Sequence, residues 1–173
     1  MTNPPEKSAP DEFAKDIFDR LKQDHDRHRG LLDKLSSTKG EGGERKELFE
    51  ELTVEVKGHA AAEEQALYST MMRKPATIDE TRHSVAEHHE IEEALNDLAA
   101  TDMSSSEWMS KFKQLDHDYR HHIEEEETDH FPGFAKHLTE EDTEHMRKVF
   151  DIRKVEERAD AEITPEAKDD AKE

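Results

Sequence analysis

The chain has 173 residues, of which 45 are Asp or Glu and 25 are Lys or Arg, so its formal net charge is −20 at pH 7. An acidic chain cannot neutralise nucleic-acid phosphates, no apolar run approaches the roughly 20 residues of a membrane span, and the lack of Cys excludes disulfides and thiolate metal sites. Leu, Ile, Val and Phe together account for only about a sixth of the chain, a proportion typical of disordered chains. Twelve His residues are a heavy load for this length, so we expect chemistry based on His and carboxylates.

The composition also suggests how the chain is divided. Residues 1–11, which hold three prolines, and the acidic segment 161–173 are expected to be disordered. Residues 12–138 are expected to form one folded domain, followed by a short helix over 139–160. The N-terminus lacks the apolar core of a secretory signal, so the sequence predicts a cytoplasmic protein.

Four longer helices are predicted from positions that recur at spacings of three and four. The first runs from residue 14 to about 36 and ends at a glycine-rich turn, and the second runs from 44 to 72 and ends before Pro75. The third covers 79–100, and the fourth extends from Trp108 to about Pro132-Gly133. Short loops join them and strand patterns are absent from the sequence, so we predict an all-α, up-down-up-down four-helix bundle with a short fifth helix.

Histidines occupy part of the inward face of each predicted bundle helix, and they repeat. The interval from His25 to His59 equals the interval from His88 to His122, so one shift along the chain, which we call the repeat shift, superposes the two pairs. The same shift places Glu63 on Glu126. The repeat therefore yields two matching sets, which are His25, His59 and Glu63 in the first half and His88, His122 and Glu126 in the second.

The spacing of these residues indicates a metal site. A His and a Glu four positions apart share one helix face, so His59 with Glu63, and His122 with Glu126, point into the bundle. A charged Glu on an apolar seam is costly unless it is paired, protonated or bound to a metal. Two such carboxylates with four imidazoles are typical of bundle cores that hold di-iron or di-manganese centres, and the donor types alone leave iron, manganese and zinc open.

Four motifs give the chain a resemblance to the hemerythrin-like (HHE cation-binding) family over residues 12–138. They are Asp24-His25, HAAAEEQALY at 59–68, EHHEIEEAL at 87–95 and HIEEEETDHFPGF at 122–134. The resemblance implies two non-haem iron ions joined by an oxo or hydroxo bridge, with the four histidines as terminal ligands and the two glutamates as bridges. It also implies a role in binding or sensing dioxygen, nitric oxide or peroxide, or in sensing or storing iron.

The chain departs from the oxygen-carrying members of that family at one position. Those members have a second His one turn after the third-helix His, where this chain has Glu92. Six ligands then leave two coordination positions open instead of one. Candidates for an additional ligand, or for a hydrogen-bond partner of a ligand, are His28, Glu92, Tyr68 and Tyr119.

Two other functions remain open from the sequence. A di-iron centre with two open positions could serve an enzyme that acts on peroxide or a small oxidisable substrate. Alternatively, the acidic helices could form a metal-free interaction module. If the chain binds metal, His121 and Glu125 could be the inward pair in place of His122 and Glu126, which we call the competing register. The spacing of Phe112, Leu115 and Tyr119 instead places His122 on the inward face of the helix. Nothing in the sequence predicts an oligomeric state.

Overall fold

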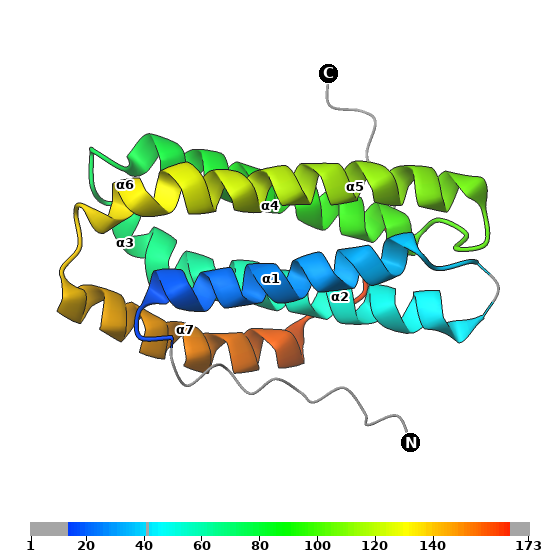
Figure 1. The fold of residues 1–173 in the computed structure, drawn as a ribbon, viewed down its shortest axis with the longest axis horizontal. Helices are drawn as coiled ribbons and strands as arrows, with labels where there is room; N and C mark the ends of the chain where they lie inside the picture. The colour runs from blue at the N-terminus through cyan, green and yellow to red at the C-terminus, as the bar shows by residue number, and fades with distance from the viewer. Residues whose placement is uncertain (1–13, 41, 167–173) are drawn as a thin grey trace.

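The computed structural model describes residues 14–40 and 42–166, which form an all-helical bundle without a strand in these two ranges (Figure 1). The expected fold is confirmed. The bundle consists of α1 (Ile17–Ser36), α2 (Gly43–Glu63), α4 (Ile78–Ala99) and α5 (Ser106–Glu125), which run alternately up and down. Residues 1–11 lie outside the described residues, as does the end of the acidic tail, whereas 161–166 follow the last helix without helical structure.

Two bundle helices continue through a π-helical turn. After α2 come η1 (Glu64–Tyr68) and α3 (Ser69–Met71), and after α5 come η2 (Glu126–His130) and α6 (Phe131–Ala135). The last of these helices continues beyond the expected end at Pro132-Gly133, because Pro132 lies in the first turn of α6, where a missing N–H is tolerated. Both π turns begin directly at or after a candidate bridging glutamate. Such turns occur frequently at functional sites.

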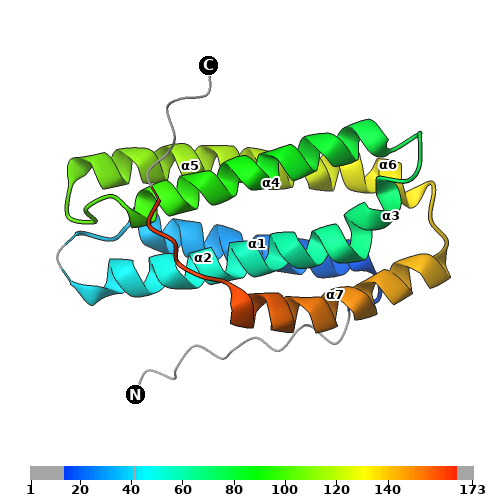
Figure 2. The ribbon, with the colours of Figure 1, turned by 180° about the vertical axis from the view of Figure 1, so that it is seen from behind.

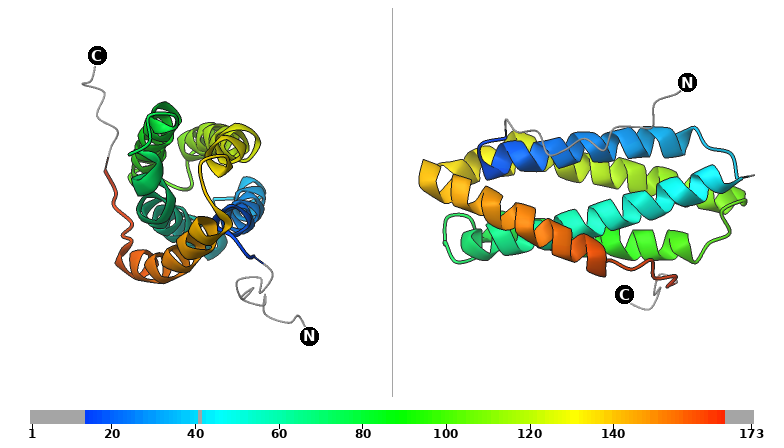
Figure 3. Two further views of the ribbon diagram at one scale, coloured as in Figure 1. Left: turned by 90° about the vertical axis from the view of Figure 1, so that its left-hand side faces the viewer. Right: turned by 90° about the horizontal axis from the view of Figure 1, so that it is seen from below.

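The fifth helix, α7 (Glu140–Asp160), lies outside the bundle along α1 and α2 (Figure 3). A capping box fixes its start, since the backbone N–H of Asp142 donates to the Thr139 hydroxyl and the Asp142 carboxylate accepts from the backbone N–H of Thr139. The helix therefore covers the first hairpin of the bundle, formed by α1 and α2, and leaves the second hairpin, formed by α4 and α5, uncovered on its equivalent side.

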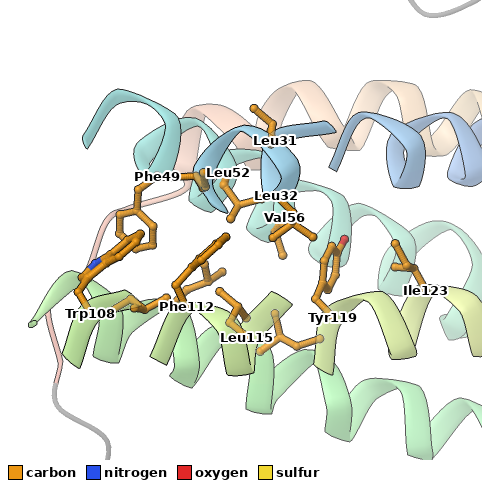
Figure 4. Close-up of a cluster of buried hydrophobic side chains, with 14 residues drawn as sticks. Leu31, Leu32, Phe49, Leu52, Val56, Trp108, Phe112, Leu115, Tyr119 and Ile123 are labelled. Atoms are coloured by element: carbon orange, nitrogen blue, oxygen red, sulfur yellow. The ribbon is translucent and has the colours of Figure 1, made fainter. Parts of the chain in front are cut away.

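The core consists of two apolar clusters separated along the bundle by a polar band. The first cluster, drawn in Figure 4, lies toward the α1–α2 and α4–α5 loops. In this cluster the ring of Trp108 stacks on that of Phe112, with the ring centroids 5.4 Å apart, and lies edge-on to Phe49, with the centroids 5.7 Å apart. The second cluster lies toward the other end, where Phe18 contacts Phe131 at 5.3 Å. The few apolar residues of the chain are thus concentrated where they can be buried, and the band between them holds the histidines.

Among the residues that the structure describes, none of the helices combines the length and the apolarity needed to cross a lipid bilayer.

Candidate metal centre

The polar band contains all six residues of the predicted repeat. Their exposed fractions are at most 8%, so they are buried. They come from α1 (His25), α2 (His59 and Glu63), α4 (His88), α5 (His122) and η2 (Glu126). The structure therefore brings together residues that are distributed over most of the folded chain.

The six residues form two half-sites. The first half-site is His25, His59 and Glu63, and the second is His88, His122 and Glu126; within each, one donor atom per residue lies within 4.8 Å of the others. The imidazole rings are 5.2 Å apart in the first half-site and 4.9 Å apart in the second. The Nε2 atom of His88 lies 3.1 Å from Glu63 Oε1, so the first glutamate also reaches the second half-site. Glu63 could therefore help to hold a cation at either half-site.

Within each hairpin, one ligand imidazole is held by the acid that precedes the first His. The Nδ1–H of His59 donates to Asp24 Oδ2 at 2.8 Å, and the Nδ1–H of His122 donates to Glu87 Oε1 at 3.1 Å. The carboxylates can only accept, so each Nδ1 carries a proton and each Nε2 faces the centre. Carboxylate partners of this kind fix the tautomer and orientation of metal-binding histidines.

The acid that follows each candidate bridging glutamate holds an imidazole of the other hairpin. The Nδ1–H of His88 donates to Glu64 Oε1 at 3.3 Å, and the Nδ1–H of His25 donates to Glu127 Oε2 at 3.4 Å. All four imidazoles thus have Nδ1 bound to a carboxylate.

The other side of two of these imidazoles is unsatisfied. The Nε2 atoms of His25 and His59, both carboxylate oxygens of Glu63, and Oε1 of Glu126 are buried and make no hydrogen bond among the described residues. The Nε2 atoms of His88 and His122 approach Glu63 Oε1 and Glu126 Oε1, respectively, as ion-pair contacts. Leaving a single buried polar group unpaired costs about 1–3 kcal/mol, and more when the group is charged. Since imidazole nitrogens and carboxylate oxygens are common metal ligands, the chemistry of these donors fits a cation-binding site.

Electrostatics support the same conclusion. Burial and the nearby Glu126 carboxylate raise the pKa of Glu63 to about 7. Burial lowers the pKa of His59 to about 3, despite the Asp24 carboxylate. Burial alone would lower the pKa of His122 too, but the Glu126 carboxylate outweighs it and raises that pKa to about 10. Without a cation, the centre is therefore a strained arrangement of like-charged carboxylates partly relieved by protons.

Three of the four additional candidates lie near the centre. The Tyr68 hydroxyl donates to Glu126 Oε2 at 2.9 Å. His28 is neutral, since burial lowers its pKa; its Nε2–H donates to Glu55 at 3.2 Å and its Nδ1 accepts from the Tyr119 hydroxyl at 2.6 Å. Both nitrogens of His28 are therefore engaged, and this residue acts as a hydrogen-bond partner in the structure.

Glu92 behaves differently. It is exposed, and it belongs to none of the groups of donor atoms that the described residues form. It lies instead on the wall of a cavity of about 500 Å³ beside α2 and α4. His59, His88 and Tyr119 also line this cavity, so the cavity connects the centre with the surface.

The segment after α7 crosses the same region (Figure 2). Lys57 Nζ, on α2, donates to the backbone oxygen of Glu162 at 2.8 Å and to Asn96 Oδ1 on α4 at 2.9 Å. Residues of this segment, among them Ala161 and Thr164, thus form part of the cavity wall.

The fifth helix places a cation beside the first half-site. Lys154 Nζ donates to Asp24 Oδ1 at 2.8 Å and to Glu55 Oε2 at 3.1 Å, and the residue is 7% exposed. Arg20 donates to the same oxygen of Asp24 at 2.6 Å. These charges and the hydrogen bond from His59 outweigh burial and hold the pKa of Asp24 well below its usual range. Asp24 is therefore a carboxylate whenever it holds His59.

The competing register does not reach the centre. His121 is 68% exposed on its side chain and lies 3.8 Å from Glu125, whereas the side chain of His122 is 1% exposed. The stepping of apolar residues along α5 therefore identified the inward histidine.

Sequence reasoning did not identify the carboxylates that hold the imidazoles, because the chain offers many acids. A signal existed nonetheless. The repeat shift places Asp24 on Glu87 and Glu64 on Glu127, and each of these acids is the chain neighbour of a candidate ligand. Lys154 had no such signal.

Comparisons with known proteins agree with this geometry. A crystal structure of a hemerythrin HHE cation-binding domain-containing protein from Mycobacterium kansasii superposes with a TM-score of 0.75 over 84% of this chain and 88% of that chain, at 24% identity. This similarity shows a common fold. Among curated protein sequences, none matches the chain. The model of the hemerythrin HHE cation-binding domain matches residues 16–134, more than half of the chain. The chain therefore belongs to the hemerythrin HHE cation-binding domain family.

Proposed function

We propose that the two half-sites bind two non-haem iron ions. The Nε2 atoms of the four imidazoles serve as terminal ligands, and Glu63 and Glu126 are shared between the ions. The observation that carries this proposal is the set of buried, unpartnered donor atoms on His25, His59, Glu63 and Glu126, which lie in the middle of the bundle. A cation-binding family supports metal in general, and paired His and Glu on facing helices favour a di-iron or di-manganese pair.

The surroundings suit a small ligand. When bound, two iron ions supply a redox-active centre at which dioxygen, nitric oxide or peroxide binds. The cavity beside α2 and α4 gives such a molecule a route to His59 and His88. Its wall combines the apolar side chains of Val56, Ile91 and Leu95 with polar ones, among them Lys57, Glu64 and Glu92. We therefore propose binding or sensing of a small ligand, or of iron itself, as the function.

Metal analysis combined with absorption spectroscopy tests this proposal. The full chain is purified, its iron content is measured, and its near-ultraviolet and visible spectrum is followed while peroxide is added. About two irons per chain and a stable, shifted spectrum are expected. Sustained release of oxygen would instead indicate an enzyme that consumes peroxide. A metal-free chain whose melting temperature is unchanged by Fe(II) would overturn the proposal in favour of an interaction module.

A further inference from the structure

We propose a second cation site on the outer face of the second hairpin, separate from the buried centre. It is formed by His83, Glu87, Glu125, Asp129 and His130, which we call the outer cluster. These residues come from α4, the end of α5 and η2. The ligand class is a borderline divalent ion such as Zn²⁺ or Fe²⁺, which accepts mixed imidazole and carboxylate ligands.

The exposed half of the outer cluster is organised around His83. Its Nε2 lies 3.1 Å from Glu87 Oε1 and 3.5 Å from Glu125 Oε2, and one donor atom from each of the three residues lies within 4.8 Å of the others. The His83 side chain is 53% exposed, so an ion can reach it from solvent. This half supplies one imidazole and two carboxylates.

The buried half adds a second imidazole whose orientation is fixed. His130 is 3% exposed, and a hydrogen bond of 2.9 Å joins its Nδ1 to the Ser84 hydroxyl. Its Nε2 therefore faces Glu125, whose Oε1 lies 3.5 Å away, and Asp129 completes a second group of three donors. The rings of His83 and His130 are 6.0 Å apart, a spacing close to the 5.2 and 4.9 Å of the two imidazole pairs in the buried centre.

The internal repeat shows that the bundle itself does not require these residue types. The repeat shift places Ala62, Ala66 and Leu67 of the first hairpin on Glu125, Asp129 and His130. These three apolar residues are buried in the cluster that also contains Met146 and Phe150 of α7. No described helix covers the second hairpin in the same way, and donor residues stand where the first hairpin has apolar ones.

The charges of the outer cluster also favour a cation. Among the described residues, the ion pairs of Glu87 and Glu125 involve histidines, and no Lys or Arg pairs with these two carboxylates. A divalent ion would supply these two carboxylates with the positive charge that no Lys or Arg provides. Glu87 Oε1 lies 3.1 Å from both His83 Nε2 and His122 Nδ1, so the outer cluster is linked to the buried centre through a single carboxylate.

Zinc uptake by the full chain tests the outer cluster. The chain carrying its own iron is dialysed against Zn²⁺, and zinc and iron are both counted, in the wild type and in the double variant His83→Ala, Glu125→Gln. We expect the double variant to bind one zinc ion per chain fewer than the wild type while its iron content and visible spectrum stay the same. Equal zinc uptake by the two proteins would overturn the proposal.

Two further variants separate this result from other causes. His89→Ala is the matched control, because His89 is 68% exposed and makes an ordinary one-turn pair with Glu93 at 3.0 Å. It should take up as much zinc as the wild type, and a loss equal to that of the double variant would contradict the site. His59→Ala removes a donor of the buried centre alone. If the difference of one zinc between proteins with and without the outer cluster persists in this background, the outer site stands whether or not the buried centre holds iron.

Discussion

The two hairpins of the bundle carry the same donors in different surroundings. His25, His59 and Glu63 repeat as His88, His122 and Glu126, and the acids that hold the imidazoles repeat with them. Of the two hairpins, the first is the one that α7 covers. The repeat therefore relates the donors of the centre, whereas the fifth helix adds one cation, Lys154, beside the first half alone.

The pKa values of the two equivalent histidines also differ, because their neighbouring carboxylates act on them differently. Burial lowers the pKa of His59 to about 3. The carboxylate of Asp24, which accepts from His59, also accepts hydrogen bonds from Lys154 and Arg20. For His122, the Glu126 carboxylate outweighs burial and raises the pKa to about 10. At neutral pH the metal-free first half-site therefore has a free imidazole lone pair at His59, and the second holds a proton at His122.

The largest expected effect on metal content is the loss of bound metal when either half is damaged. Substituting His59→Ala or His122→Ala removes a donor that the structure leaves without an alternative, so both variants should lose bound metal. The stabilisation by the ligand disappears with it, which amounts to about 2.7 kcal/mol when the free metal is at about 100 times its Kd. Metal content and the melting temperature measure both effects.

The control for this pair is His121→Ala, at the exposed neighbour of His122. It should keep its metal and its melting temperature. Loss of metal in His121→Ala with retention in His122→Ala would contradict the assigned register.

Lys154→Met should remove the cation that distinguishes the first hairpin from the second, and so destabilise the chain. It leaves Asp24 and Glu55 buried with one cation fewer, while Arg20 still pairs with Asp24 and Arg158 with Glu55. The cost should therefore stay below the about 3–5 kcal/mol of a buried charge left without any partner. Denaturant unfolding of the metal-free chain measures the change. Lys148→Met, at an exposed position of the same helix, should have little effect. Equal stability of the two variants would show that α7 does not support the first half-site.

The affinity for metal should depend on pH through His88 and His122 of the second half-site, and through Glu63, whose pKa burial and Glu126 raise to about 7. Opposing carboxylates outweigh burial and raise the pKa of His88 to about 9 and that of His122 to about 10, so both imidazoles carry a proton in the metal-free chain at pH 7. An ion must displace these protons, and its affinity should therefore rise as the pH rises from 7 to 9. His59, already neutral, contributes no such dependence in this range. Calorimetric titration with Zn²⁺ in buffers of different ionisation enthalpy should detect proton release, and binding without proton release would contradict these pKa values.

The smallest expected effect comes from two glycines. A Cβ on Gly30 would meet no atom within 4 Å, so Gly30→Ala should stabilise the chain by about 0.5–1 kcal/mol. A Cβ on Gly58 would lie 2.6 Å from Arg158 Cγ and 3.3 Å from the Arg158 backbone, where α7 approaches α2 closely. Gly58→Ala should therefore be the less stable of the two variants in thermal unfolding, and the opposite order would show that α7 is free to move away.

The bundle helices and the six candidate donors could be predicted from the sequence, because they follow a regular spacing along the chain. The four bundle helices and the inward positions of the six donors follow from spacings of three and four, and the repeat shift relates the two halves. The position of Lys154 could not be predicted in this way. It is a polar residue on a helix outside the repeat, and only tertiary packing against Asp24 and Glu55 decides that it is buried. The π turns after Glu63 and at Glu126 likewise have no signature in the spacing.

The most direct test of the central claim is a metal count on the purified chain, with anomalous diffraction at the iron edge to locate the ions. The account predicts about two irons per chain, one beside each imidazole pair and both in contact with Glu63 and Glu126. A chain that is folded, free of metal and unchanged in melting temperature on adding Fe(II) would contradict it.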